Sequence, residues 1–239
     1  MITIKDSVAI ILSVLLFCAC IFGIIKQTEK NIVSVIATES NEYKDCIFIL
    51  DAGHGGEDGG AVAYDGTLEK DLNLRICNNI SLYFDIFGID YVIIRNGDFS
   101  VGNTNLPTIR KRKASDIYKR YEIINSYENS VLLSIHQNMF SVEKYSGTQV
   151  FYDGKYNESE ELAKILQFTV RSSLQPENNR KIKKTDKSIY LLYEAKRPSV
   201  MVECGFMSNM KELSSLRNTE YQSKLSFIIT KGIIQFLIS

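Results

Sequence analysis

The chain has 239 residues, which is enough for one sizeable domain and a short additional segment but little for two full domains. Lys+Arg and Asp+Glu balance at 28 each, so the overall charge predicts no nucleic-acid partner. Five cysteines without a CxxC spacing argue against a complete disulfide framework. The sequence leaves open the state of Cys46, Cys77 and Cys204.

The N-terminal segment predicts a membrane anchor. Residues 7–25 form a run of 19 residues without a charge, about the length that crosses a bilayer as a helix. The run is long for the apolar part of a signal peptide and no clear cleavage site follows, so a cleaved signal is the alternative, with a buried core helix third. We expect a signal anchor over residues 1–25, a polar linker over 26–45 and one globular domain over 46–239.

The remainder alternates between two kinds of apolar pattern. Short, nearly continuous apolar runs typical of buried strands occupy residues 46–50, 91–95, 131–135, 148–152 and 199–203. Apolar stripes with helical spacing occupy residues 68–84, 117–124, 162–170 and 225–236. This alternation predicts an α/β fold: a single three-layer domain whose central, mostly parallel or mixed twisted sheet is flanked by helices.

Both histidines of the chain follow predicted strands. His54 and His136 lie just beyond two of the apolar runs, and Glu203 ends a third. In open α/β sheets, sites form beyond the carboxyl ends of the strands. A lone histidine there is more often structural, but two at one edge favour metal ligation.

Glu69 is the best candidate for a third ligand. It falls in the first turn of a predicted helix, with Thr67 as a plausible N-cap. Its alternative role is a favourable interaction with the helix macrodipole. Two histidines and a glutamate leave one position of tetrahedral zinc open, as catalytic zinc sites do. The same ligand types also form the facial triad of iron(II) oxygenases.

Glu203 is placed to act as the general base that takes a proton from water. The alternative is a buried carboxylate paired with an arginine, but "SVMVECGF" contains no basic residue. Cys204 as a nucleophile is a further alternative. With no third histidine to activate it, we expect a small core residue.

The glycine-rich stretch "LDAGHGGEDGGA" (50–61) surrounds His54. It contains neither GxGxxG nor GxxxxGK[ST], so the two usual phosphate-binding patterns are absent. We expect its glycines to let the backbone turn sharply and to let substrate come close.

Four sequence blocks resemble those of a known family. "ILDAGHGGEDGGA", "LEKDLNL", "RYEIIN" followed by "LLSIHQN", and "PSVMVECGFMSN" are similar to the signature blocks of the zinc-dependent N-acetylmuramoyl-L-alanine amidases of bacterial cell walls. The resemblance implies hydrolysis of the amide between N-acetylmuramic acid and L-alanine in peptidoglycan. It also implies one Zn²⁺ held by His54, Glu69 and His136, with Glu203 as the catalytic glutamate.

The domain layout resembles that of the germination-specific amidases of spore-forming bacteria. That likeness implies a role in spore cortex maturation through muramic-δ-lactam formation, and a membrane-anchored protein whose catalytic domain is extracytoplasmic. Gln137, Met139 and Ile124 depart from the family's usual small residues, which implies a reshaped groove or a helper protein that affects zinc occupancy. A zinc carboxypeptidase and a non-catalytic, membrane-tethered peptidoglycan-binding module stay open as alternatives.

Overall fold

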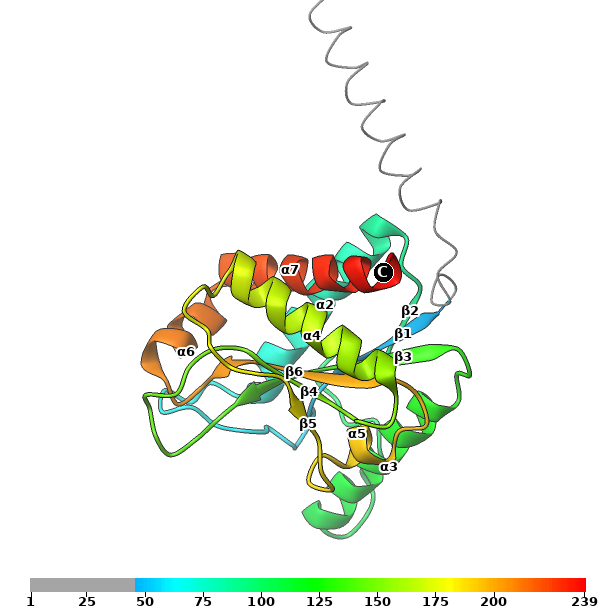
Figure 1. The fold of residues 1–239 in the computed structure, drawn as a ribbon. Coiled ribbons are helices and arrows are strands. Elements are labelled where there is room, and N and C mark those ends of the chain that lie inside the picture. Colours follow the sequence, from blue (N-terminus) through cyan, green and yellow to red (C-terminus); the bar gives the residue numbers. More distant parts are fainter. Residues whose placement is uncertain (1–45) are drawn as a thin grey trace, which may run out of the picture. The chain divides into compact units, whose positions relative to one another are not determined.

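A six-stranded sheet forms the centre of the computed structural model, which describes residues 46–239 (Figure 1). The strands lie in the order β2-β1-β3-β6-β4-β5, and only the β4–β6 pair is antiparallel. Their bounds are β1 Ile47–Ala52, β2 Tyr91–Ile93, β3 Ser130–Asn138, β4 Gln149–Tyr152, β5 Lys183–Lys184 and β6 Ser199–Phe206. The expected α/β domain with a mixed sheet is confirmed.

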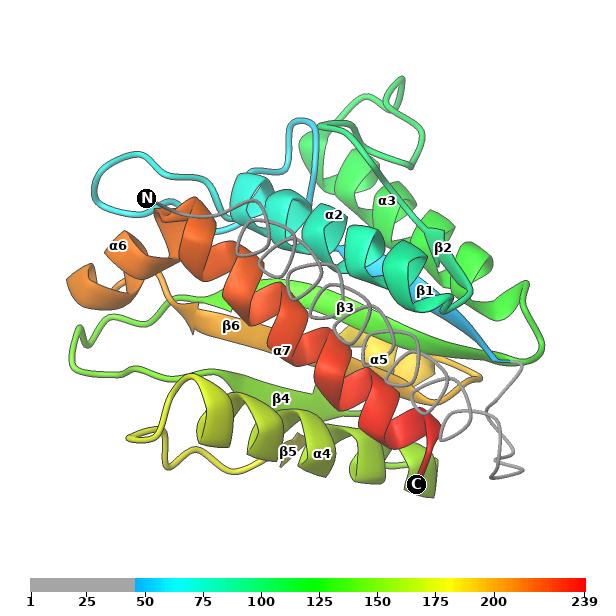
Figure 2. The same cartoon turned by 90° about the horizontal axis from the view of Figure 1, so that it is seen from above.

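Helices cover both faces of this sheet. One layer contains α2, α4 and α7, and the opposite face carries α3 and α5, as the two views show (Figures 1 and 2). The bounds are α2 Glu69–Phe87, α3 Ile109–Asn125, α4 Asn157–Ser173, α5 Tyr190–Glu194, α6 Met210–Arg217 and α7 Thr219–Leu237. Because helices lie on both faces, the central strands are buried on both sides, which explains their continuous apolar sequences.

The core beneath α3 and α5 locks these helices to the sheet. Ile49, Leu132 and Met201 project from β1, β3 and β6 and pack in one cluster with Ile124 of α3 and Leu192 of α5. Side chains alternate along a strand, so the residues next to these point to the other helix layer. The same alternation sets which face of the sheet each residue beyond the core occupies.

The predicted stripe on α3 is wrong in part. Ile124 is buried, but Ile117 is 40% exposed and Tyr121 is half-buried. The buried face of α3 also contains Arg120, whose charge is paired inside the domain. Ile117 instead lines a surface cavity, so its exposure reflects the position of α3 beside that cavity.

The expected N-cap at Thr67 is also wrong, although Glu69 lies in the first turn as expected. Helix α2 begins at Glu69 with Leu68 at the N-cap, and no side chain caps it. The glycine-rich loop supplies the missing acceptors, because Glu69 N donates to Ala61 O (2.9 Å) and Lys70 N donates to Gly59 O (3.1 Å). The loop carbonyls thus take the place that a capping side chain would have.

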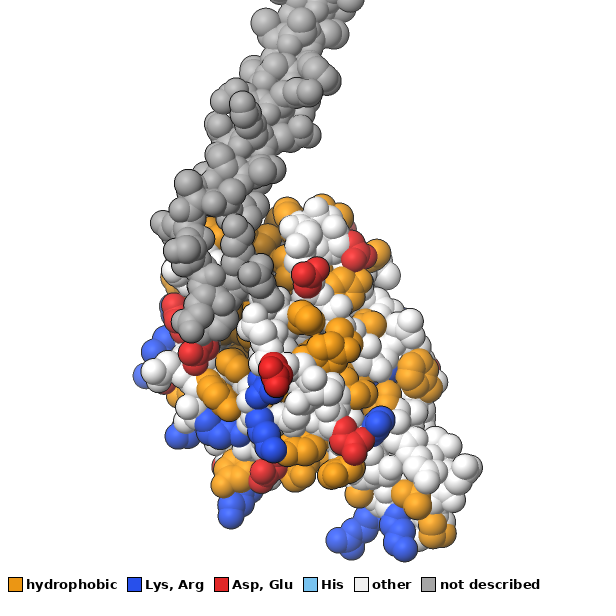
Figure 3. All heavy atoms as spheres, turned by 90° about the vertical axis from the view of Figure 1, so that its right-hand side faces the viewer, with side chains coloured by type: hydrophobic (Ala, Val, Ile, Leu, Met, Phe, Trp, Pro, Cys, Tyr) orange, Lys and Arg blue, Asp and Glu red, His pale blue; other side chains and the backbone are white. Residues whose placement is uncertain are grey.

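Within residues 46–239, no helix is both long and apolar enough to cross a membrane. The predicted anchor and linker (1–45) lie outside the described residues. On the face drawn in Figure 3, hydrophobic side chains are interspersed with Lys, Arg, Asp and Glu. Scattered apolar side chains of this kind are ordinary at a protein surface.

Candidate metal centre

His54 lies in the glycine-rich loop that follows β1. Its backbone has φ 63°, in the left-handed region that non-glycine residues rarely adopt. Asp58, four residues on, contacts the Nδ1 of the ring at 2.9 Å. The Nε2 then lies 3.2 Å from Glu69 Oε2. A carboxylate behind one ring nitrogen, with the other nitrogen aimed at the site, is the usual support of a metal-binding histidine.

Glu69, the first residue of α2, is 4% exposed, and both of its oxygens accept hydrogen bonds. Oε1 accepts from Gln137 N (3.1 Å) and Asn73 Nδ2 (3.3 Å), while Oε2 accepts from Ala61 N (2.9 Å). These donors hold the carboxylate in one orientation and favour its ionised form.

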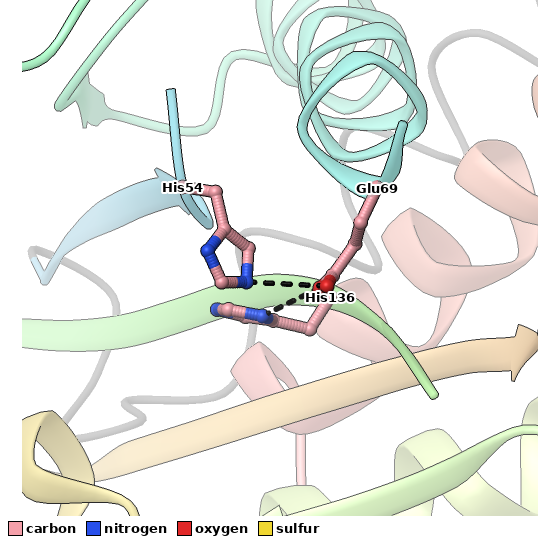
Figure 4. Close-up of side chains that lie close together, drawn as sticks. All are labelled: His54, Glu69 and His136. Carbon is pink, nitrogen blue, oxygen red and sulfur yellow. Dashed lines mark hydrogen bonds and ion pairs between the residues drawn. The ribbon is translucent and has the colours of Figure 1, made fainter. Parts of the chain in front are cut away.

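His136 completes the group from β3. Its Nδ1 lies 2.9 Å from Glu69 Oε1, and its ring centroid is 5.0 Å from that of His54. Figure 4 shows the two imidazole rings on the same side of Glu69. The three residues come from three different segments of the chain. One ligand atom from each residue lies within 4.8 Å of the others. The structure thus brings together the three predicted ligands.

The charges of this group suit a cation. Burial alone would lower the pKa of His54, but hydrogen bonds to Asp58 and Glu69 raise it to about 9. Burial likewise opposes ionisation of Glu69, but the two histidines hold its pKa well below its usual range. Two imidazole nitrogens and one carboxylate oxygen are a donor set of catalytic zinc sites, so these residues fit the ion.

Glycines make room for the ligands. A Cβ on Gly53 would lie 2.2 Å from the His136 ring. A Cβ on Gly60 would lie 2.6 Å from Glu69 Oε2 and 2.7 Å from His54 Cδ2. Gly60 also has φ 68°, as the expected sharp turns require. The close approach that these two glycines permit is therefore to the ligand side chains themselves.

Glu203 stands beside His136 in the sheet. The two residues are register partners on the parallel strands β3 and β6. Glu203 Oε2 is buried and has no hydrogen-bond partner among the described residues. Burial, with a smaller contribution from the charge of Glu69, raises the pKa of Glu203 to about 7 against the opposing effect of His136. No described arginine pairs with it, so the arginine-paired alternative is not what the structure contains.

A cavity of about 310 Å³ opens over these residues. His54, His136 and Glu203 line it together with Ile117 of α3 and residues 188–191 at the start of α5. An apolar cavity with a few convergent polar groups is the usual form of a small-molecule site. Three of the four predicted site residues therefore face one solvent-accessible space, with Glu69 behind them.

Arg120 supports the His54 loop and was not predicted. Its buried guanidinium pairs with Asp51 and with Asp116 and donates from Nη2 to His54 O at 2.6 Å. Burial alone would raise the pKa of Asp51, but Arg120, His136 and Ser134 together lower it below its usual value. The available sequence signal was an arginine on the predicted apolar face of a helix, together with an aspartate directly after a strand.

Cys204, adjacent to Glu203, is fully buried, and burial raises the pKa of its thiol. A thiol that resists ionisation is a poor nucleophile. The structure supports the interpretation of Cys204 as a core residue.

Comparison with known proteins agrees with the resemblance. Residues 48–235 match the model of the N-acetylmuramoyl-L-alanine amidase family. The chain is 37% identical over 190 residues to the germination-specific N-acetylmuramoyl-L-alanine amidase of Bacillus subtilis, covering 80% of this chain and 79% of that protein.

Solved structures share the fold. The CwlD amidase from Clostridioides difficile, solved in complex with the GerS lipoprotein, superposes with a TM-score of 0.77 at 38% identity, over 81% of this chain and 98% of that one. The amidase AmiC2 of Nostoc punctiforme gives 0.66 at 27% identity, over 80% and 97%. The chain therefore belongs to the N-acetylmuramoyl-L-alanine amidase family.

Proposed function

We propose that this protein hydrolyses the amide bond between N-acetylmuramic acid and L-alanine in peptidoglycan, with Zn²⁺ bound by His54, Glu69 and His136. The observation that carries the proposal is the convergence of these three residues with Glu203 at one cavity. Zinc, when bound, polarises a carbonyl oxygen and makes a water molecule more acidic. The alternative of an iron(II) facial triad uses only the two histidines and one carboxylate, so it gives Glu203 no role beside the ligands.

Glu203 is the general base in this proposal. Its Oε2 has no hydrogen-bond partner in the described residues, so it is available to accept a proton from the attacking water. The hydroxide oxygen bonds to the carbonyl carbon, the C–N bond breaks, and the proton held by Glu203 passes to the nitrogen of alanine. A pKa of about 7 suits both halves of this transfer.

The other groups position these residues. Asp58 orients the His54 ring, Arg120 fixes the backbone of the same residue, and Asn73 restrains Glu69. Supports of this kind typically change metal affinity or activity about 10- to 100-fold when removed.

The decisive experiment compares the zinc-loaded wild-type chain with Glu203→Gln on purified peptidoglycan, with products identified by mass spectrometry. From the wild type we expect glycan whose muramic acid carries a free carboxyl group, and peptides that carry a new alanine amine. Glu203→Gln should keep its zinc but lose about 10²- to 10⁴-fold in rate, the usual contribution of general base catalysis.

Other products would support other functions. Release of a C-terminal amino acid would indicate a carboxypeptidase, and saturable wall binding without a new amine would indicate a non-catalytic module. Iron rather than zinc in the purified protein would favour oxygenase chemistry. Near-full turnover by Glu203→Gln would refute the role of Glu203.

We also propose a sporulation role, supported by the germination-specific relative. In this proposal, residues 1–25 anchor the protein in a membrane, residues 26–45 link the anchor to the domain, and the catalytic domain (46–239) acts outside the cytoplasm. Spore cortex from cells lacking the gene should contain no muramic-δ-lactam. The related CwlD amidase was solved with a lipoprotein, which supports a helper protein here as well.

A further inference from the structure

A basic segment that includes β5 directly precedes residues that line the cavity. Residues 180–187, "RKIKKTDK", contain five cations and one acid in a chain whose total charge is zero. Residues 188–191, which directly follow, line the cavity. The excess positive charge is therefore concentrated in the segment that leads into the cavity lining.

Two of these cations lie on the same face of the sheet as Glu203. Gln149 of β4 is the register partner of Glu203, and Phe151 is the partner of Met201. Lys183 of β5 pairs with Phe151, and its Nζ lies 5.6 Å from the centre of that ring. Because side chains alternate along a strand, Lys183 shares the face of Glu203.

Lys184 lies on the other face. It pairs with Tyr152, one residue beyond Phe151. Its side chain packs against Gly154, where an added Cβ would meet the lysine Cε at 2.2 Å. Neighbouring lysines of one short strand thus serve opposite faces of the sheet.

Arg180 is held in a fixed orientation toward Gln149. Its Nη1 donates to Gln149 Oε1 (3.2 Å) and its Nε donates to Ser146 O (2.7 Å). Its guanidinium carbon lies 4.3 Å from the centre of the Phe206 ring. A guanidinium that is already ordered loses little further entropy when it binds a ligand.

Neither Arg180 nor Lys183 forms an ion pair with a carboxylate of residues 46–239. The charge of Arg180 favours the ionised form of Glu212. The Glu212 carboxylate already accepts hydrogen bonds from the backbone N–H groups of Gly147 and Phe206. Asp186 feels the charge of Lys183 and accepts from Ser188 N. Both cations therefore remain available to a negatively charged ligand.

The spacing matches a peptide that extends from the cleaved bond. Adjacent strands are about 4.8 Å apart, so β5 lies about 10 Å from β6. An extended peptide advances about 3.3–3.6 Å per residue, so a carboxylate two or three residues beyond the cleaved amide would lie about 7–10 Å from it.

We propose that Arg180 and Lys183, with Gln149 between them and Glu203, form a cationic subsite that binds a carboxylate of the substrate's peptide beyond the alanine. This inference rests on the proposed amidase function and adds the peptide specificity of the same site. The subsite raises affinity for acidic peptides and leaves the chemical step unchanged.

The test compares two soluble muropeptides that differ only in whether the peptide carboxylates beyond alanine are free or amidated. With the full-length, zinc-loaded protein in detergent, Arg180→Gln and Lys183→Gln should each raise KM for the free-carboxylate substrate roughly fivefold, with kcat unchanged. KM for the amidated substrate should not change. For the wild type, KM for the acidic substrate should rise with ionic strength.

Lys184→Gln is the matched control, because it removes the same charge from the opposite face and should leave both KM values unaltered. Arg180→Lys should recover much of the affinity that Arg180→Gln loses. An equal KM rise for both substrates, or none, would overturn the subsite. So would an equal effect of Lys184→Gln. If the wild type cleaves neither substrate, the proposed function itself fails.

Discussion

At the scale of single residues, Glu203 combines two properties that rarely coexist. It is next to a cluster of polar groups, yet its Oε2 has no hydrogen-bond partner within the described domain. An unpaired buried carboxylate costs stability when it is charged. We expect that cost to be measurable in the metal-free protein, independently of any activity.

The stability of the metal-free protein should therefore depend on pH. The pKa of Glu203 is about 7 in the folded protein, compared with 4.5 for an unperturbed glutamate in the unfolded chain. The folded state therefore binds the proton of Glu203 more tightly. The stabilisation this gives is fully present below pH 4.5 and is lost as the pH rises through 7. Glu203→Gln should match the wild type near pH 4 and exceed it by up to about 3 kcal/mol at pH 8.

Urea unfolding of chelator-treated protein at both pH values measures this difference. Glu143→Gln, a substitution of an exposed glutamate in the loop after β3, is the control and should show no such pH trend. A Glu203→Gln difference that stays constant from pH 4 to pH 8 would contradict the assigned pKa.

The four proposed site residues could be predicted from sequence because their types and positions carry the signal. His54 and His136 follow apolar runs and Glu203 ends one, and parallel strands bring such positions to one edge. Asp58 could not be predicted, since its hydrogen bond to His54 depends on the path of a loop. Asn73 lies one helical turn from Glu69 on α2, but an asparagine at that spacing does not by itself indicate a role. Polar side chains of this kind occur throughout the sequence without any distinguishing pattern.

At the scale of elements, the loop between β1 and α2 performs two tasks. Its carbonyls accept from the first turn of α2, and its glycines leave space for the ligand side chains. The sequence predicted the turns but not the helix start, because the capping groups are backbone atoms eight to eleven residues upstream. Helices α5 and α6 and strand β5 were not predicted, since each is too short for a periodic apolar pattern.

Gly60→Ala tests the second task. Gly60 has φ 68° and Gly66 has φ 85°, so alanine is strained at both positions. A Cβ at Gly60 would collide with Glu69 and His54, whereas a Cβ at Gly66 meets nothing within 4 Å. We expect both variants to lose about 1 kcal/mol or more of stability. Only Gly60→Ala should also lose zinc affinity, by roughly 10-fold or more.

Zinc titration against a competing chelator, with each variant's unfolding measured separately, distinguishes the two effects. Equal zinc affinity in both glycine variants would show that the loop's backbone conformation, and not the space beside the ligands, is what matters.

At the scale of the whole molecule, the strand order sets the distance between the metal ligands and the basic segment of residues 180–187. The order β2-β1-β3-β6-β4-β5 puts the ligand-bearing strands in the middle and β5 two strands from Glu203. The fold class was predictable from the alternation of patterns. The strand order was not, because the antiparallel insertion of β4 leaves no mark in a four-residue apolar run.

Residues 1–45 precede this domain and include the predicted membrane anchor. Residues 7–25 are uncharged and predominantly apolar, so the full-length chain should fractionate with membranes and resist extraction by high salt. A chain that begins at residue 46 lacks this apolar run and should be released into the supernatant. Because every proposed site residue lies in 46–239, this shortened chain should cleave soluble muropeptides with an unchanged kcat. Replacing residues 7–25 by a polar sequence of equal length separates anchoring from chain length. Membrane association that survives this replacement would place the anchor elsewhere, and a lost kcat would assign residues 1–45 a part in the site.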